Sequence, residues 1–240
     1  MKNYGKILKL VVLSMLIALG VVISPILRFE GMCPMAHFIN IICSVLLGPW
    51  YSLLCATLIG IIRMVTMGIP PIALTGAIFG AYFSGVFYRA SNGKILFAVL
   101  GEIIGTGIIG AVISYPVMSV LWNKEGLSWL FYVPSFICGT LIGGSIAFVF
   151  LRKLSNAGIL THFQNMLVSK SYTDKSGVLS DALSIAALGV IIFLVIEILT
   201  GIFKMTAPIW SYISYSAMIA CIITAAIYYV TKKVKKVEKI

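Results

Sequence analysis

Long apolar stretches separated by short polar or basic segments make up almost the whole chain. Because about 20 apolar residues are needed to cross the hydrocarbon core of a bilayer as a helix, these stretches predict membrane-spanning helices. Eight are predicted, at residues 7–27, 36–47, 50–66, 72–88, 95–121, 128–151, 179–203 and 209–231. Composition agrees, since hydrophobic residues make up 60% and charged residues 10%, against about 25% charged in soluble domains. The predicted fold class is all-α, a polytopic bundle of membrane helices.

Prolines, glycines and one polar stretch divide this pattern. The predicted helix 36–47 is too short to cross alone, and it stops at Gly48-Pro49. A tight turn is expected there, because proline cannot continue a helix and glycine accepts unusual backbone angles. Residues 155–176 are polar. We therefore predict a six-helix membrane domain (1–153), a cytoplasmic polar loop (154–178) and an additional transmembrane helix pair with a basic cytoplasmic tail (179–240).

The positive charges indicate how the helices are oriented. The formal net charge is +11, and the Lys and Arg residues cluster at the ends of apolar stretches. With the N-terminus inside, only Arg28, Arg63, Lys124 and Lys204 fall at outer ends, which leaves 14 of the 18 basic residues on the cytoplasmic side. This bias follows the positive-inside rule and predicts a multi-pass protein of the cell membrane with both termini cytoplasmic. It also argues against nucleic-acid binding.

Motifs for hydrolytic and metal chemistry are missing from the sequence. There is no GxxxxGK[ST] loop to hold phosphates and no HExxH, and the chain has only two histidines. The five cysteines form no CxxC pair and lie mostly in apolar runs, so neither a metal site nor a disulfide is expected. We expect no cofactor and no enzymatic activity. If the chain moves a solute uphill, a partner must hydrolyse ATP.

Polar side chains inside the predicted helices are the candidate ligand-binding groups, because burying them is costly and usually functional. His37 and Asn40 are three residues apart and share a helix face, and Glu102 lies about eight residues into its helix. Arg63 and His37 could equally be interfacial residues that reach water; for Glu102, function or a buried ion pair is favoured. Such groups suit a mainly apolar pocket. The full candidate set is His37, Asn40, Arg63, Glu102, Tyr115, Trp129 and Tyr132.

Small residues four positions apart recur in most of the predicted helices. Such spacing lets a second helix backbone approach closely. The simpler interpretation is that these pairs pack the chain's own bundle, and the alternative is that one of them docks on a separate membrane subunit. The pairs are Ser14/Ala18, Ala56/Gly60, Gly76/Gly80/Ser84, Gly101/Gly105 and Gly139/Gly143/Ala147.

Several of these residues lie in stretches that resemble the ThiW family. They are MAHFINII at 35–42, LLGPWY at 46–51 with Arg63, and GEIIGTGIIG at 101–110 with SYP at 114–116. ThiW proteins are substrate-binding (S) components of energy-coupling factor (ECF) transporters, assigned to the thiazole precursor of thiamine. The resemblance covers residues 7–153 and implies six helices, a ligand site near the outer face, and partners: an EcfT-type transmembrane coupling protein and two cytoplasmic ATPases. Ser14 and Ala18 occupy the place of the coupling contact.

The resemblance implies a substrate-capture subunit that binds hydroxyethylthiazole from outside. His37 and Asn40 would hydrogen-bond the ring nitrogen or the hydroxyl, and Arg63 and Glu102 would form a supporting ion pair. Because this ligand is neutral, apolar and aromatic walls would supply most of the affinity. Three alternatives stay open: an S component for another thiamine precursor or vitamin, an intramembrane enzyme using Glu102 and His37 as acid and base, and a structural membrane subunit. The last two helices depart from the family pattern.

Overall fold

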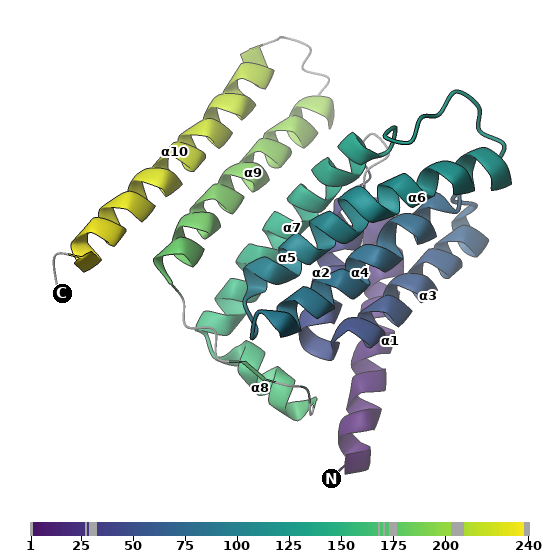
Figure 1. Ribbon diagram of the computed structural model, residues 1–240, viewed down its shortest axis with the longest axis horizontal. Helices are drawn as coiled ribbons and strands as arrows, with labels where there is room; N and C mark the ends of the chain where they lie inside the picture. The colour runs from purple at the N-terminus through teal and green to yellow at the C-terminus, as the bar shows by residue number, and fades with distance from the viewer. Residues whose placement is uncertain are drawn as a thin grey trace. The chain divides into compact units, whose positions relative to one another are not determined.

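The computed structural model describes residues 2–26, 28, 33–167, 169, 171–172, 177–202 and 209–237. Within these ranges the chain consists of helices joined by turns, which confirms the all-α prediction. Five of the helices, including Gly5–Ile26 and Ile95–Leu121, are long and apolar enough to cross a membrane. The elements (Figure 1) are α1 (Lys2–Ile26), α2 (Pro34–Leu47), α3 (Pro49–Met67), α4 (Ile72–Ala90), α5 (Ile95–Glu102), η1 (Ile103–Gly110), α6 (Ala111–Pro116), η2 (Val117–Leu121), α7 (Val133–Asn156), α8 (Ile159–Met166), α9 (Val178–Ile202) and α10 (Ile209–Val237).

The chain divides into two compact units, residues 1–174 and residues 175–240. The first contains α1 to α8. The second is a hairpin in which α9 and α10 lie side by side (Figure 1). Gly189 allows close packing in this hairpin, since a Cβ added there would lie 2.5 Å from the Cβ of Cys221. The basic residues Lys170, Lys175, Lys204 and Lys239, used above to predict orientation, lie outside the described residues.

Glycine and proline set the helix ends at the α2–α3 turn. Pro34 and Pro49 occupy the first positions of α2 and α3, where a missing N–H costs no helical hydrogen bond. Between the helices, Gly48 has a φ of 95°, which only glycine adopts freely. Its N–H donates to the carbonyl of Ser44 at 3.0 Å. The tight turn predicted at Gly48-Pro49 is therefore confirmed.

Helix α2 is short because it lies inside the first unit. Ten of its 14 residues are buried. It packs against α1, α3, α4 and α7, and Figure 1 shows it among them. A helix covered by neighbours in this way need not match the thickness of the bilayer, which explains the short apolar stretch in the sequence. The residues of α2 are therefore well placed to form an internal site.

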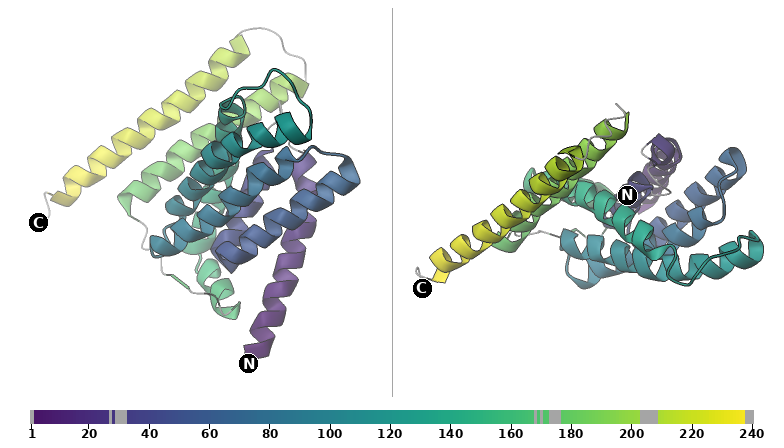
Figure 2. Two further views of the ribbon diagram at one scale, coloured as in Figure 1. Left: turned by 45° about the vertical axis from the view of Figure 1, so that its right-hand side comes forward. Right: turned by 90° about the horizontal axis from the view of Figure 1, so that it is seen from above.

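The segments α5, η1, α6 and η2 form one helical rod, and its glycines pack against α4. In both views of Figure 2 this rod runs beside α4. A Cβ at Gly105 would lie 2.7 Å from the Cα of Gly80, and one at Gly101 would lie 2.7 Å from the Cα of Ser84. The two small-residue faces thus meet within the chain, as the simpler interpretation predicted. Residues 103–110 of the rod are π-helical, a geometry frequent at functional sites.

The polar stretch predicted as a loop after residue 153 contains a helix. Helix α7 runs on to Asn156, Gly158 turns the chain with a φ of 73°, and α8 follows. Leu160, Gln164 and Leu167 are buried against the first unit. Gln164 Nε2 donates to the backbone carbonyl of Val45 and to the Tyr88 hydroxyl, each at 3.0 Å. The polar composition of this stretch led to the prediction of a loop, although the buried positions 160, 164 and 167 follow the spacing of a helix face.

Candidate functional site

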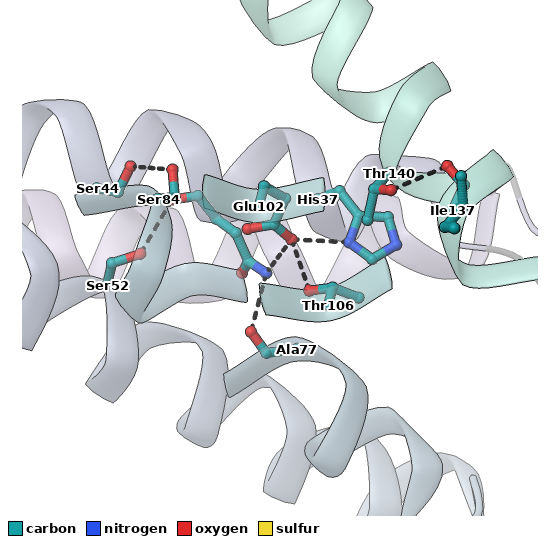
Figure 3. Close-up of polar contacts among 10 residues, drawn as sticks. His37, Ser44, Ser52, Ala77, Ser84, Glu102, Thr106, Ile137 and Thr140 are labelled. Atoms are coloured by element: carbon teal, nitrogen blue, oxygen red, sulfur yellow. Dashed lines mark hydrogen bonds and ion pairs between the residues drawn. The ribbon is translucent and has the colours of Figure 1, made fainter. Parts of the chain in front are cut away.

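A buried carboxylate, Glu102 at the end of α5, is the centre of the polar interior. Its side chain is completely buried. Its Oε1 accepts hydrogen bonds from His37 Nδ1 at 2.9 Å, Asn40 Nδ2 at 3.0 Å and Thr106 Oγ1 at 3.1 Å (Figure 3). Its Oε2 has no hydrogen-bond partner among the described residues. Three donors on one oxygen offset much of the cost of burying the group.

The backbone of α4 completes the surroundings of this carboxylate. Asn40 Nδ2 also donates to the carbonyl of Ala77 at 3.3 Å (Figure 3). A Cβ added at Gly80 would lie 2.8 Å from Glu102 Oε1 and would also collide with Thr106 Oγ1. Glycine is therefore required at position 80 for the carboxylate to hold this position. The small-residue spacing on α4 serves the site as well as the helix packing.

A group of hydroxyls next to Glu102 fixes α2 on its neighbours. Ser44 and Ser84 share a hydrogen bond of 2.7 Å, and Ser52 Oγ donates to the backbone carbonyl of Asn40 at 3.0 Å (Figure 3). All three serines are buried. None of the three was predicted as a site residue, since Ser84 appeared only in a row of small residues, and Thr106 was not predicted either. The available signal was a hydroxyl four residues after Glu102, which places both side chains on one helix face.

A cavity lies beside this cluster, at the end of the bundle where α2, α4 and α7 begin and α3 ends. The cavity volume is about 70 Å³, which is smaller than the roughly 300–1,000 Å³ of pockets that hold drug-sized ligands. Its apolar lining consists mainly of Phe136 and small aliphatic residues of α2 and α4. Its polar lining consists of Arg28, Cys33, His37, Arg63, Thr106 and Ser135.

His37 connects the buried carboxylate to the cavity. It is 8% exposed and lines the cavity, while Glu102 does not. Glu102 Oε1 accepts hydrogen bonds from Asn40 and Thr106. We therefore assign the proton of the third bond to His37 Nδ1, which donates a hydrogen bond to the same oxygen. The other ring nitrogen, Nε2, is then left for a ligand. A carboxylate that holds one ring nitrogen fixes the tautomer and the orientation of the imidazole.

Arg63 does not form the predicted ion pair with Glu102. Among the described residues, the ion-pair partner of Glu102 is His37. Arg63 is 4% exposed, and its Nη2 contacts Cys33 Sγ at 3.5 Å. Its Nε has no hydrogen-bond partner in the described part of the chain. Arg63 therefore belongs to the wall of the cavity and not to the Glu102 cluster.

The remaining predicted site residues lie away from the cavity wall. Asn40 is 2% exposed and acts on Glu102, not on the cavity. The rings of Tyr115 and Trp129 pack together with centroids 4.6 Å apart. Tyr132 packs against Phe136 with ring centroids 5.9 Å apart, and burial raises the pKa of the Tyr132 hydroxyl. Tyr132 thus supports an aromatic residue that does line the cavity, and ligand contact by the other two aromatics stays a prediction.

Ser14 and Ala18 differ from the other small-residue pairs. Both are exposed on α1. The Ser14 hydroxyl donates to the carbonyl of Leu10 in its own helix at 2.9 Å. Gly76, Gly80 and Gly105, in contrast, lie against other helices of the first unit. A face of small residues on α1 is thus open to a neighbour in the membrane.

The described residues do not form a metal-binding cluster. Within the described ranges, no group of three or more His, Cys, Asp or Glu side chains is arranged to hold a metal ion. His37 and Glu102 contribute only two such groups to the site. All five cysteines are free thiols. The geometry of this site is that of a small-molecule pocket with an oriented histidine.

A family model described as thiamine-precursor transporter protein (ThiW) matches residues 10–157, more than half of the chain. The chain belongs to the ThiW family. The matched region contains α1 from residue 10 onward, all of α2 to α7, and every residue that lines the cavity. Membership makes the chain a thiamine-precursor transporter of the membrane, and helices α8 to α10 lie beyond the matched region. No curated protein and no solved structure matched the chain.

Proposed function

We propose that this ThiW protein is the substrate-capture (S) component of an ECF-type importer and that it binds hydroxyethylthiazole from outside the cell. The observation that carries the proposal is the His37 imidazole, which is held by buried Glu102 and faces a cavity at one end of the bundle. The ligand site of an importer must open to one side of the membrane and present few, well-oriented polar groups. This cavity meets both requirements.

The chemistry of the cavity suits a thiazole alcohol. His37 Nε2 accepts a hydrogen bond from the ligand hydroxyl or, when the ring is doubly protonated, donates one to the thiazole nitrogen. Phe136 and the aliphatic side chains of α4 provide an apolar wall for the ring. Asn40 and Thr106 act indirectly, by holding the Glu102 carboxylate that orients His37.

The positive-inside rule supports an outward-facing cavity. The cavity lies at the start of α7, near Ser135. Arg152 and Lys153 lie in the last turns of the same helix, and Arg89 and Lys94 lie at the corresponding ends of α4 and α5. If these basic ends are cytoplasmic, as the rule requires, both termini are cytoplasmic and the cavity opens outward.

Uptake also needs an energy source, because the sequence has no phosphate-binding loop. In the proposal an EcfT-type coupling protein and two ATPases supply it, and the coupling protein contacts α1 at Ser14 and Ala18. We expect Ser14→Leu with Ala18→Leu to abolish co-purification with the energising subunits. Met15→Leu, an exposed substitution on the same helix, is the control. Co-purification that persists in the double variant would overturn this docking face.

The substrate is tested by equilibrium binding of radiolabelled hydroxyethylthiazole to the purified full chain. Saturable binding in the micromolar range or tighter is expected, and its absence would overturn the substrate assignment. Competition with the pyrimidine half of thiamine and with intact thiamine separates this precursor from other vitamins. His37→Ala should weaken binding by more than tenfold while leaving it measurable. The matched control is His162→Ala, because His162 is the other histidine of the chain and is exposed on α8.

A further inference from the structure

The charged groups that line the cavity are cationic. Arg28 and Arg63 each contribute a guanidinium group, and His37 contributes an imidazole. Among the described residues, none of those that line the cavity is an Asp or a Glu. The carboxylate of Glu102 lies behind His37, and one of its oxygens is already occupied by three donors. Within the described part of the chain, a ligand that enters this cavity therefore meets two guanidinium groups and no carboxylate.

Arg63 is the residue that most requires a partner. Its side chain is 4% exposed, and its Nε has no hydrogen-bond partner among the described residues. Its Nη2 contacts Cys33 Sγ, which is a weak acceptor. An arginine stays charged at any physiological pH, and a buried charge is costly unless it is paired. Residues 29–32, which include Glu30, lie outside the described part of the chain. Within the described part, the Nε of Arg63 remains available to an acceptor in the cavity.

Three helix N-termini add to this positive potential. Ala36 and His37 lie in the first turn of α2, Ile72 and Ala73 in the first turn of α4, and Ser135 in the first turn of α7, and all of them line the cavity. The N-terminus of a helix carries about half a positive elementary charge, which favours anions nearby. Helix α3 ends at the cavity, and a helix C-terminus carries a partial negative charge. The three N-termini nevertheless outnumber this one C-terminus.

We propose that the cavity takes its thiamine precursor in an anionic form, as a thiazole whose side chain bears a carboxylate or a phosphate monoester. The inference rests on the proposed function and specifies the class of its substrate. The anionic group contacts Arg63, with Arg28 at the more exposed edge, and the ring lies against Phe136. The planar donor fork of arginine matches the oxygens of carboxylates and phosphates. A neutral alcohol brings no negative charge to Arg63, which has no carboxylate partner among the described residues.

Isothermal titration calorimetry on the purified full chain tests this. Four compounds are compared: hydroxyethylthiazole, the corresponding thiazole acetic acid, the phosphate monoester of hydroxyethylthiazole, and inorganic phosphate alone. At least one anionic thiazole is expected to bind about tenfold more tightly than the alcohol, the gain of one charge-assisted hydrogen bond. Which anion binds best distinguishes a carboxylate from a phosphate ligand. Inorganic phosphate alone should bind far more weakly than either anionic thiazole, because it lacks the ring.

Variants then assign the preference to the cavity arginines. Arg63→Gln should abolish the preference for the anionic thiazoles while affinity for the alcohol is kept. Arg63→Lys should retain part of this preference. Arg28→Gln should reduce it. Lys124→Gln, which removes an exposed charge from the loop before α7, should leave it unchanged. Glu30→Gln should leave the preference intact or increase it.

The outcomes separate the two proposals. If the alcohol binds as tightly as both anions, the anionic-substrate inference is overturned while the capture function stands. A preference that survives both Arg63→Gln and Arg28→Gln also overturns the inference. If no thiazole compound binds, the substrate assignment itself fails. Should Arg63→Gln not fold, as judged by gel filtration and circular dichroism, the wild-type comparison and Arg28→Gln decide the question.

Discussion

Replacing Glu102 by glutamine keeps the shape of the side chain and removes its charge. In the wild type, Glu102 Oε1 accepts three hydrogen bonds, one of which holds His37 Nδ1 at 2.9 Å. An amide oxygen can accept the same bonds, but without charge assistance. The amide nitrogen takes the place of Oε2, which has no hydrogen-bond partner among the described residues. The variant therefore weakens the fixation of the imidazole without opening a cavity.

The expected magnitude follows from the bonds that change. A hydrogen bond to a charged group contributes roughly 1.5–3 kcal/mol and a neutral one roughly 0.5–1.5 kcal/mol. The bond to His37 should thus weaken by about 1–1.5 kcal/mol, which corresponds to about a tenfold loss of ligand affinity if the ring must be held to bind. The free energy of unfolding should change less, because losing three charge-assisted bonds is offset by no longer burying a charge.

The assay is ligand binding to purified Glu102→Gln, with Glu125→Gln as the matched control because Glu125 is exposed. A double-mutant cycle with His37→Ala tests the route of the effect. If Glu102 acts through His37, the double variant binds no worse than His37→Ala alone. Wild-type affinity in Glu102→Gln, or additive losses in the cycle, would refute the reasoning. Lost uptake with unchanged binding would instead favour the intramembrane enzyme left open by the sequence.

Two further substitutions test the packing that supports the site. Gly80→Ala should displace the Glu102 and Thr106 side chains, lower the free energy of unfolding by about 1–3 kcal/mol and weaken ligand binding. Thermal unfolding and ligand titration measure the two effects. Gly177→Ala is the control and should change neither stability nor affinity, because no atom lies within 4 Å of the added Cβ. Gln164→Leu should lower stability by about 2–4 kcal/mol, since it leaves two buried groups without their donor, whereas exposed Asn165→Leu should have little effect. If a variant is as stable as its control, Gly80→Ala as Gly177→Ala or Gln164→Leu as Asn165→Leu, the contact that the variant was designed to break does not stabilise the fold.

The sequence by itself determined the all-helical class, the approximate spans and the turn at Gly48. Helix formation and membrane burial depend on local apolar content and on proline and glycine, which can be read along the chain. The sequence also singled out Glu102 and His37, because an ionisable group inside an apolar stretch is costly wherever it packs. The motifs around His37, Gly48 and Glu102 together indicated the family, which the family model then confirmed over residues 10–157.

Only the tertiary structure decided which of these groups meet. Spacing within one helix cannot show that Glu102 pairs with His37, 65 positions away, and not with Arg63. The pairing depends on how α2 packs beside α4 and α5, and that packing depends on glycines whose contacts lie in other helices. The tertiary structure also places Arg63 in the cationic wall of the cavity, whereas an ion pair with Glu102 had been predicted from the sequence. Long-range contacts of this kind set the electrostatics of the site, and no local pattern encodes them.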